Sequence, residues 1–117
     1  MANTLITVPR TARSGEIIEV RALVQHPMET GYRRSSDGDM LPRDLIRRFS
    51  CRFVATAKDS VGKDAGELVF SATFYAAVAA NPYLSFNLRA ATSGTLEFLW
   101  EGDKGFVQRE VANLSVA

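Results

Sequence analysis

Apolar side chains occupy every second position along most of this sequence. Within residues 18–24, the even-numbered positions Ile18, Val20, Ala22 and Val24 are all apolar. The same period of two recurs at residues 49–53, 68–74, 84–90 and 96–100. In a strand, such alternation directs one set of side chains into the core and the other set to the opposite face. The pattern therefore predicts β-strands rather than helices, whose apolar period is 3.6 residues.

Turn-forming residues separate the alternating segments. We expect seven strands, at residues 4–9, 16–25, 46–56, 66–76, 84–91, 94–101 and 105–116. Seven short antiparallel strands are typical of an all-β, immunoglobulin-like β-sandwich. The glycine-rich residues 102–105 lack the spacing of a phosphate-binding loop and instead predict a hairpin turn. The alanine-rich residues 75–80 leave a single helical turn as an alternative.

Length and charge narrow the class of protein. A chain of 117 residues fits one domain, 1–117, and 46% hydrophobic residues are enough for a core. A net charge of +1 gives no positive field for nucleic acid or for an anionic membrane. No signal peptide or membrane-spanning stretch is recognised. Taken alone, these features predict a cytoplasmic protein, unless the chain is exported with a partner that carries the signal.

Few residues could carry chemistry. His26 is the single histidine and Cys51 the single cysteine, so no spaced set of zinc ligands appears and no internal disulfide can form. We expect His26 to end a strand and hydrogen-bond locally. We expect Cys51 to lie buried in a strand, or else to pair with a second chain. No catalytic residue, metal or cofactor is predicted, although a site assembled in space from His26 and Cys51 or an aspartate remains an alternative.

The longest segment without strand character is residues 26–45, and loops of this length are usually functional or mobile. Arginines cluster in and after this segment, at Arg33, Arg34, Arg43, Arg47 and Arg48. They indicate either a solvated loop or an arginine-rich edge for an acidic or anionic partner.

Several apolar residues fall out of phase with the predicted core. They are Ile17, Leu23, Val69, Tyr75 and Leu99. Either bulges shift the phase of these strands, or another chain covers an outer face of the sandwich. We favour the second interpretation.

Three segments and one strand carry a family resemblance. The segments are residues 26–33 (His-Pro-Met-Glu-Thr-Gly-Tyr-Arg), residues 79–86 (Ala-Ala-Asn-Pro-Tyr-Leu-Ser-Phe), followed by Ser93-Gly94, and residues 100–105 (Trp-Glu-Gly-Asp-Lys-Gly). Together with the strand around Cys51, they resemble the SoxZ family of sulfur-oxidation proteins. The likeness extends from about residue 4 to the end of the chain.

The resemblance implies a non-catalytic immunoglobulin-like subunit that pairs with SoxY, as a heterodimer or a higher SoxYZ oligomer. This complex is the carrier of bacterial thiosulfate oxidation, and a cysteine on the flexible C-terminal arm of SoxY holds the sulfur intermediates for the other pathway enzymes. The last five residues of this sequence, 113–117, contain no such cysteine. The resemblance also implies a periplasmic location, reached together with a signal-bearing partner.

Candidate residues for partner binding or for a functional loop are His26, Pro27, Met28, Glu29, Arg33, Arg34, Asn81, Pro82 and Tyr83. Of these, Arg33 and Arg34 are candidates for steering anionic sulfur species or an acidic partner surface. A stand-alone module that binds a sulfur oxyanion through His26 and the arginines is an alternative. We also expect that the isolated chain can form a homo-oligomer through the face meant for its partner.

Overall fold

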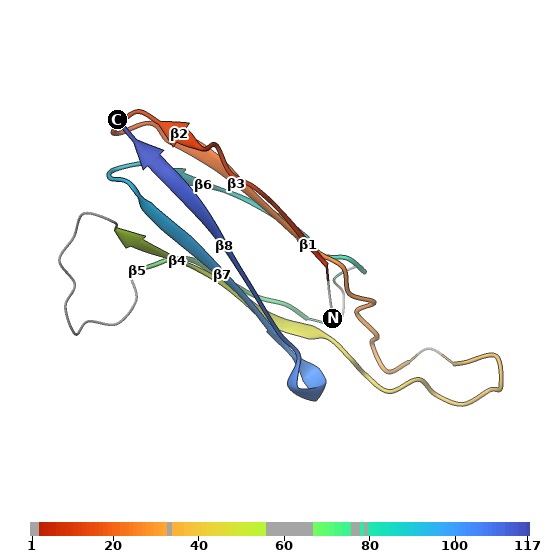
Figure 1. The fold of residues 1–117 in the computed structure, drawn as a ribbon. Coiled ribbons are helices and arrows are strands. Elements are labelled where there is room, and N and C mark those ends of the chain that lie inside the picture. The colour runs from red at the N-terminus through yellow and green to blue at the C-terminus, as the bar shows by residue number, and fades with distance from the viewer. Residues whose placement is uncertain (1–2, 33, 56–66, 76–77, 79) are drawn as a thin grey trace.

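The computed structural model describes residues 3–32, 34–55, 67–75, 78 and 80–117, which are mostly strands (Figure 1). The strands are β1 (Thr4–Thr7), β2 (Thr11–Ala12), β3 (Ile17–Val24), β4 (Ile46–Ala55), β5 (Glu67–Thr73), β6 (Tyr83–Arg89), β7 (Gly94–Gly102) and β8 (Val107–Val116). The predicted all-β sandwich is confirmed. The alanine-rich run, with its alternative of a helical turn, lies partly outside the described residues, at 76–77 and 79. In the described part, no helix is long and apolar enough to span a bilayer.

Two sheets form the layers of the sandwich (Figure 1). Their strand orders are β1-β3-β6 and β2-β8-β7-β4-β5. The predicted first strand, 4–9, ends earlier, at Thr7, and a further short strand, β2, follows it in the second sheet. Pro9 lies between them and has no N–H with which to continue a ladder. An eighth short strand and a parallel pairing, β2 with β8, are therefore features that the sequence did not predict.

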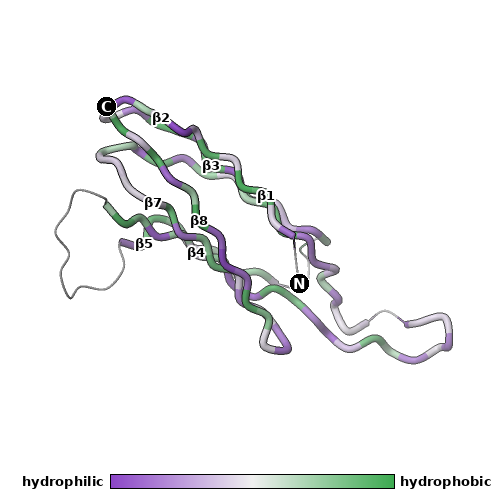
Figure 2. The backbone as a smooth tube through the Cα atoms, in the orientation of Figure 1, coloured by the Kyte–Doolittle hydropathy of each residue, from purple (hydrophilic) through white to green (hydrophobic). Residues whose placement is uncertain are grey.

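Aromatic side chains dominate the core between the sheets. The first sheet contributes Val20 and Val24, which have no exposed area. The facing sheet contributes Phe49, whose ring lies 6.2 Å from Phe98 and 5.1 Å from Trp100. Burying one such side chain stabilises the fold by about 1.5–3 kcal/mol. The burial of alternate residues in β3 and β7 confirms the period of two, and Figure 2 shows hydrophobic and hydrophilic stretches interspersed along both sheets.

The outer faces of both sheets carry apolar residues, as expected. Leu23 is half-buried at the outer face of the three-stranded sheet, and Leu99 is half-buried at the outer face of the five-stranded sheet. Ile17 and Tyr75 are 52% and 72% exposed. Because these four apolar side chains remain partly or largely exposed, they are available for contact with another chain.

A β-bulge corrects the predicted phase of β5. The register of β4 against β5 shifts between Cys51 and Arg52, so that Arg52 pairs with Leu68. Leu68, which was expected in the core, is 43% exposed, whereas Val69, which was expected outside, packs against the core. A bulge adds one residue to a strand and moves the following side chains to the other face.

The described residues of the segment 29–44, all but Arg33, form a hairpin-like arm, hereafter the arm, that extends beyond the ends of the strands (Figure 1). Two backbone hydrogen bonds of 2.9 and 2.8 Å close its base, between Glu29 and Asp44. An isolated bridge between Arg34 and Met40 pairs its two sides nearer the tip. The long segment without strand character is thus a paired extension of the sandwich, which positions its charged side chains away from the core.

Candidate functional site

The three motif-bearing segments of the sequence meet at the end of the sandwich where the arm leaves it. We call this region the arm base and define it by His26, Met28, Asp44, Asn81 and Asp103. The residues come from the segment after β3, the end of the loop just before β4, the turn before β6 and the turn between β7 and β8. Strand pairing β3–β6 and β4–β7 brings these turns to one end.

Two hydrogen bonds join His26 to Asn81 across 55 positions of sequence. The backbone N–H of His26 donates to Oδ1 of Asn81 at 2.9 Å, and the backbone N–H of Asn81 donates to the carbonyl of His26 at 2.7 Å. Asn81 has φ of 54°, in the left-handed region that asparagine tolerates better than most residues. Its backbone conformation and its short amide side chain together suit it to this turn.

The imidazole of His26 is engaged on both nitrogens and is only 5% exposed. The backbone N–H of Met28 donates to Nδ1 at 3.0 Å, so Nδ1 is an acceptor and the ring proton lies on Nε2. Nε2 lies 3.6 Å from Oδ1 of Asp44, and the ring edge contacts Phe106 with centroids 4.9 Å apart. His26 therefore hydrogen-bonds locally, as expected from its position. A carboxylate beside Nε2 also disfavours a sulfur oxyanion at this ring.

Asp103 fixes the other side of the arm base. Its carboxylate accepts hydrogen bonds from the backbone N–H of Leu45 at 3.0 Å and from Nε of Arg43 at 3.1 Å, and Nη1 of Arg47 lies 3.8 Å away. The bond from Leu45, with the charges of Arg43 and Arg47, lowers the pKa of Asp103. The turn 102–105 is a hairpin turn, as predicted, closed by the Gly102 N–H donating to the carbonyl of Phe106.

Met28 is a further anchor of the arm base. It is 4% exposed with φ of 53°, and its sulfur accepts the backbone N–H of Ile46 at 3.2 Å. Sequence reasoning named Met28 as a candidate for partner binding or a functional loop, included Asp103 only in a turn motif, and did not name Asp44. A cluster of polar and apolar side chains that comes from four turns leaves no local spacing signal in a sequence.

The other predicted site residues are dispersed. Pro82 is buried beside the arm base, where its carbonyl accepts the N–H of Val24, whereas Pro27 is exposed. Tyr83 is 55% exposed at the start of β6. Arg34 lies in the arm, where its guanidinium donates to the carbonyl of Gly38 at 2.7 Å. The remaining candidates are Glu29, which pairs with Asp44 as described, and Arg33, which lies outside the described residues.

Cys51 lies in the middle of β4 with no exposed area. Burial raises the pKa of its thiol to about 12. At neutral pH the thiol is therefore protonated, and the nucleophilic thiolate is essentially absent. The expectation of a buried strand residue is confirmed, and a pairing of Cys51 with a second chain is wrong for the folded state because the sulfur is inaccessible. Within the described residues, no group of three or more His, Cys, Asp or Glu side chains could hold a metal ion.

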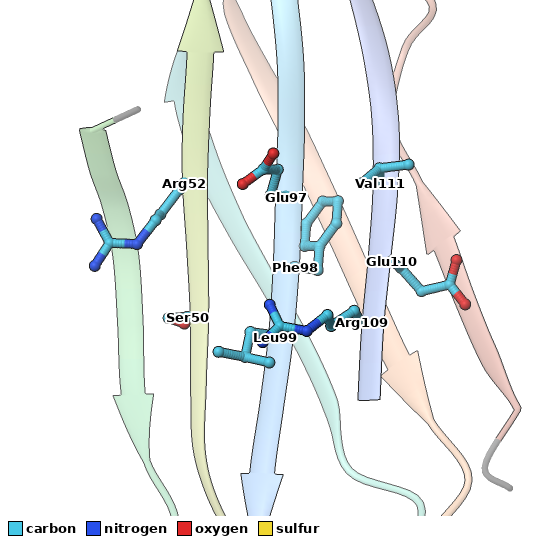
Figure 3. Close-up of a pocket in the computed structure, with 8 residues that line it drawn as sticks. All are labelled: Ser50, Arg52, Glu97, Phe98, Leu99, Arg109, Glu110 and Val111. Atoms are coloured by element: carbon cyan, nitrogen blue, oxygen red, sulfur yellow. The ribbon is translucent and has the colours of Figure 1, made fainter. Parts of the chain in front are cut away.

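A shallow hollow of about 220 Å³ lies on the outer face of the five-stranded sheet (Figure 3). Its lining includes Ser50 and Arg52 of β4, Glu97 and Leu99 of β7, and Arg109 and Val111 of β8. Figure 3 shows Arg109 reaching across β7 beside Leu99, while Arg52 extends over β5. Of these residues, sequence reasoning singled out only Leu99, because the others are spread over three strands that only the fold brings together.

Comparisons with known proteins give one family and one fold. The chain matches a family model described as Sulphur oxidation protein SoxZ over residues 6–113. A search of curated proteins found no match. Among solved structures, it is similar to a superoxide reductase (neelaredoxin) from Ignicoccus hospitalis, with a TM-score of 0.72 and 15% identity, covering 97% of this chain and 80% of that one.

Two further solved structures have the same fold. The sulfur carrier protein SoxY from Chlorobium limicola f thiosulfatophilum has a TM-score of 0.59 and 17% identity, with 97% of this chain and 78% of that chain covered. A putative superoxide reductase from Thermotoga maritima has a TM-score of 0.64 and 15% identity, with 97% and 85% covered. At these identities the likeness shows a shared sandwich and not a shared activity.

Proposed function

The chain belongs to the SoxZ family of sulphur oxidation proteins, and we propose that it is the non-catalytic subunit of a SoxYZ sulfur carrier complex in thiosulfate oxidation. The family match over residues 6–113 is the observation that carries the proposal, and it assigns the chain to the sulfur oxidation system. In our proposal the chain binds SoxY, stabilises its fold and helps to present the carrier cysteine of SoxY to the other enzymes of the pathway.

The chemistry of Cys51 supports a carrier cysteine on the partner rather than on this chain. Covalent attachment of sulfur needs an accessible thiolate, whereas Cys51 is the single cysteine, has no exposed area and has a thiol pKa of about 12. A sulfur intermediate therefore has no suitable attachment point on this subunit. The solved SoxY structure is that of a sulfur carrier protein with the same sandwich fold, which fits the role of the partner.

The contacts at the arm base also support a structural role for this chain. The ring of His26 is occupied by the Met28 N–H and by Asp44, and the Asp103 carboxylate by Leu45 and Arg43. These contacts hold backbone turns in place and leave no free acid–base pair aimed at a cavity. The likeness to superoxide reductases extends to the fold, and the proposal carries no redox activity over to this chain.

We further propose a periplasmic location, reached by export together with a signal-bearing SoxY. The support for this is the family resemblance. It predicts that the chain, expressed without its partner, stays in the cytoplasm, and that co-expression with SoxY moves it to the periplasmic fraction.

Intact-mass spectrometry of the purified complex tests the carrier role. After incubation with thiosulfate and the pathway enzymes, we expect sulfur adducts on the SoxY chain and an unchanged mass for this chain. The Cys51→Ala variant serves as a control and should leave the adducts on SoxY unaltered. A sulfur adduct on Cys51 of the native complex contradicts the proposal.

A further inference from the structure

The two outer faces of the sandwich differ in how their charged groups are bonded. On the three-stranded sheet, the carboxylate of Glu19 accepts hydrogen bonds from Arg21 at 3.0 Å and from the hydroxyl of Ser85 at 2.6 Å. The central charges of that face are therefore satisfied within the chain. The apolar residues of the same face lie apart, with Ile17 at one end of β3 and, at the other end, a short row in which Leu5 and Tyr83 flank Leu23.

The outer face of the five-stranded sheet is different, because its charges are left without partners. Its charged residues are Arg48, Arg52, Glu97, Glu101 and Arg109. Among the described residues, the side chain of none of them makes a hydrogen bond or an ion pair within the chain. Arg52 and Glu97 are directly opposite in the β4–β7 register and still remain apart (Figure 3). Arginine presents five donors in a planar fork, which makes such free side chains suited to carboxylates of another protein.

Apolar side chains are interleaved with these charges. Leu99 lies between Ser50 and Arg109, and Val111 is 65% exposed at the end of the row that begins at Leu68 and passes through Arg52 and Glu97. The hollow of about 220 Å³ opens between these rows. Protein interfaces combine such a part-apolar centre with arginines, and the hollow offers a place for one side chain of the partner.

The size of the face matches a stable interface. Strands β5, β4, β7 and β8 lie side by side, and with a spacing of about 4.8 Å they cover a width of roughly 19 Å. Along the ten residues of β4, the length is about 30 Å. The flat footprint is therefore roughly 570 Å², of the same order as the roughly 800 Å² of accessible area that one partner contributes to a standard interface.

We propose that this face, centred on Leu99 with Arg52 and Arg109 on either side, is the docking surface for the SoxY partner. This inference rests on the proposed function. SoxY is itself a sandwich of this fold, and two sandwiches can pack one sheet face against another, as the two sheets do within each sandwich. The partner's face carries carboxylates opposite Arg52 and Arg109 and an apolar side chain that enters the hollow beside Leu99.

A matched pair of variants tests the assignment. Leu99→Arg places a charge on the central strand of the five-stranded face, and Leu23→Arg places it on the central strand of the three-stranded face. Binding of each purified variant to purified SoxY from the same organism is measured by calorimetry, after circular dichroism has verified the fold. We expect Leu99→Arg to weaken binding about tenfold or more and Leu23→Arg to change it less than about threefold.

The outcomes separate this inference from the proposed function. If the wild-type chain does not bind SoxY, the proposed function fails and the docking face fails with it. If the wild type binds and Leu99→Arg binds equally well, or if both variants lose binding, the assignment of the five-stranded face is overturned while the function stands. The assignment is also overturned if Leu99→Arg changes only self-association of the chain. Should Leu99→Arg fail to fold, the double variant Arg52→Glu and Arg109→Glu on exposed positions decides by the same criterion.

Discussion

His26 and Asn81 bind each other twice, through a backbone N–H of His26 that donates to the Asn81 side chain and a backbone N–H of Asn81 that donates to the His26 carbonyl. This pair joins the two longest motifs of the family resemblance. It places them at the base of the arm, where their hydrogen bonds hold the conformation of the turns.

Removal of the Asn81 side chain should loosen the arm base. In Asn81→Ala, the His26 N–H loses its acceptor and an alanine occupies a backbone with φ of 54°. We expect the free energy of unfolding to fall by about 1–2 kcal/mol, measured by urea denaturation. Asn81→Asp keeps an acceptor oxygen and should lose less. Equal stability of the alanine variant and the wild type contradicts the role given to this pair.

Asp103 should make the stability of the protein depend on acid pH. Its pKa is lowered below the ordinary 3.8 in the folded state, first by the hydrogen bond from Leu45. A lowered folded pKa contributes stability that is present above the unfolded pKa and is lost as the pH falls through the folded value. Asp103→Asn should therefore be less stable than the wild type at pH 7, and the difference should shrink below about pH 4.

The measurement is urea unfolding of both proteins between pH 7 and pH 2. Glu19 also has a lowered pKa, through Ser85 and Arg21, but it is present in both proteins and cancels in the difference. A difference between wild type and variant that stays constant over the whole range contradicts the account of Asp103.

Cys51 should not react in the native protein. Its thiol has no exposed area and a pKa of about 12, so aromatic disulfide reagents at pH 8 should label it only when the chain unfolds. The labelling rate in a urea series should follow global unfolding measured by tryptophan fluorescence. Fast, stoichiometric labelling under native conditions is the result that disagrees with a buried cysteine.

Packing between the sheets should set most of the stability. Leu96 has no exposed area, and Leu96→Ala should lower the free energy of unfolding by about 2–5 kcal/mol, because a cavity remains between the sheets. Leu5 is 64% exposed on β1, so Leu5→Ala is the matched control, with a loss below about 1 kcal/mol. Similar losses for the two variants contradict the placement of the core.

Sequence reasoning reached the fold because the period of two persists in β3, β6 and β7, and in β4 from Phe49 onward, where strand alternation and burial agree. It failed in β5, where the bulge at Cys51 and Arg52 reverses the faces of Leu68 and Val69. Nothing in the local sequence marks this bulge, since it depends on how β4 and β5 are paired.

The candidate site was harder to predict than the fold. His26, Met28 and Asn81 were singled out from motifs, but their contacts depend on the β3–β6 register. Asp103 and Arg43 are 60 positions apart in sequence, and only the β4–β7 pairing brings them together. The unpaired arginines of the five-stranded face could not be predicted for the same reason. Whether a charged side chain finds a partner depends on the side chains of the neighbouring strands.

The most direct test of the carrier-subunit account is light scattering on this chain mixed with purified SoxY from the same organism, after size-exclusion chromatography. The account predicts that the two chains elute together in equal proportions at a mass above that of either alone, and that the complex persists on dilution, as is usual for large permanent interfaces. Two separate peaks at micromolar concentration, with both proteins folded, contradict it.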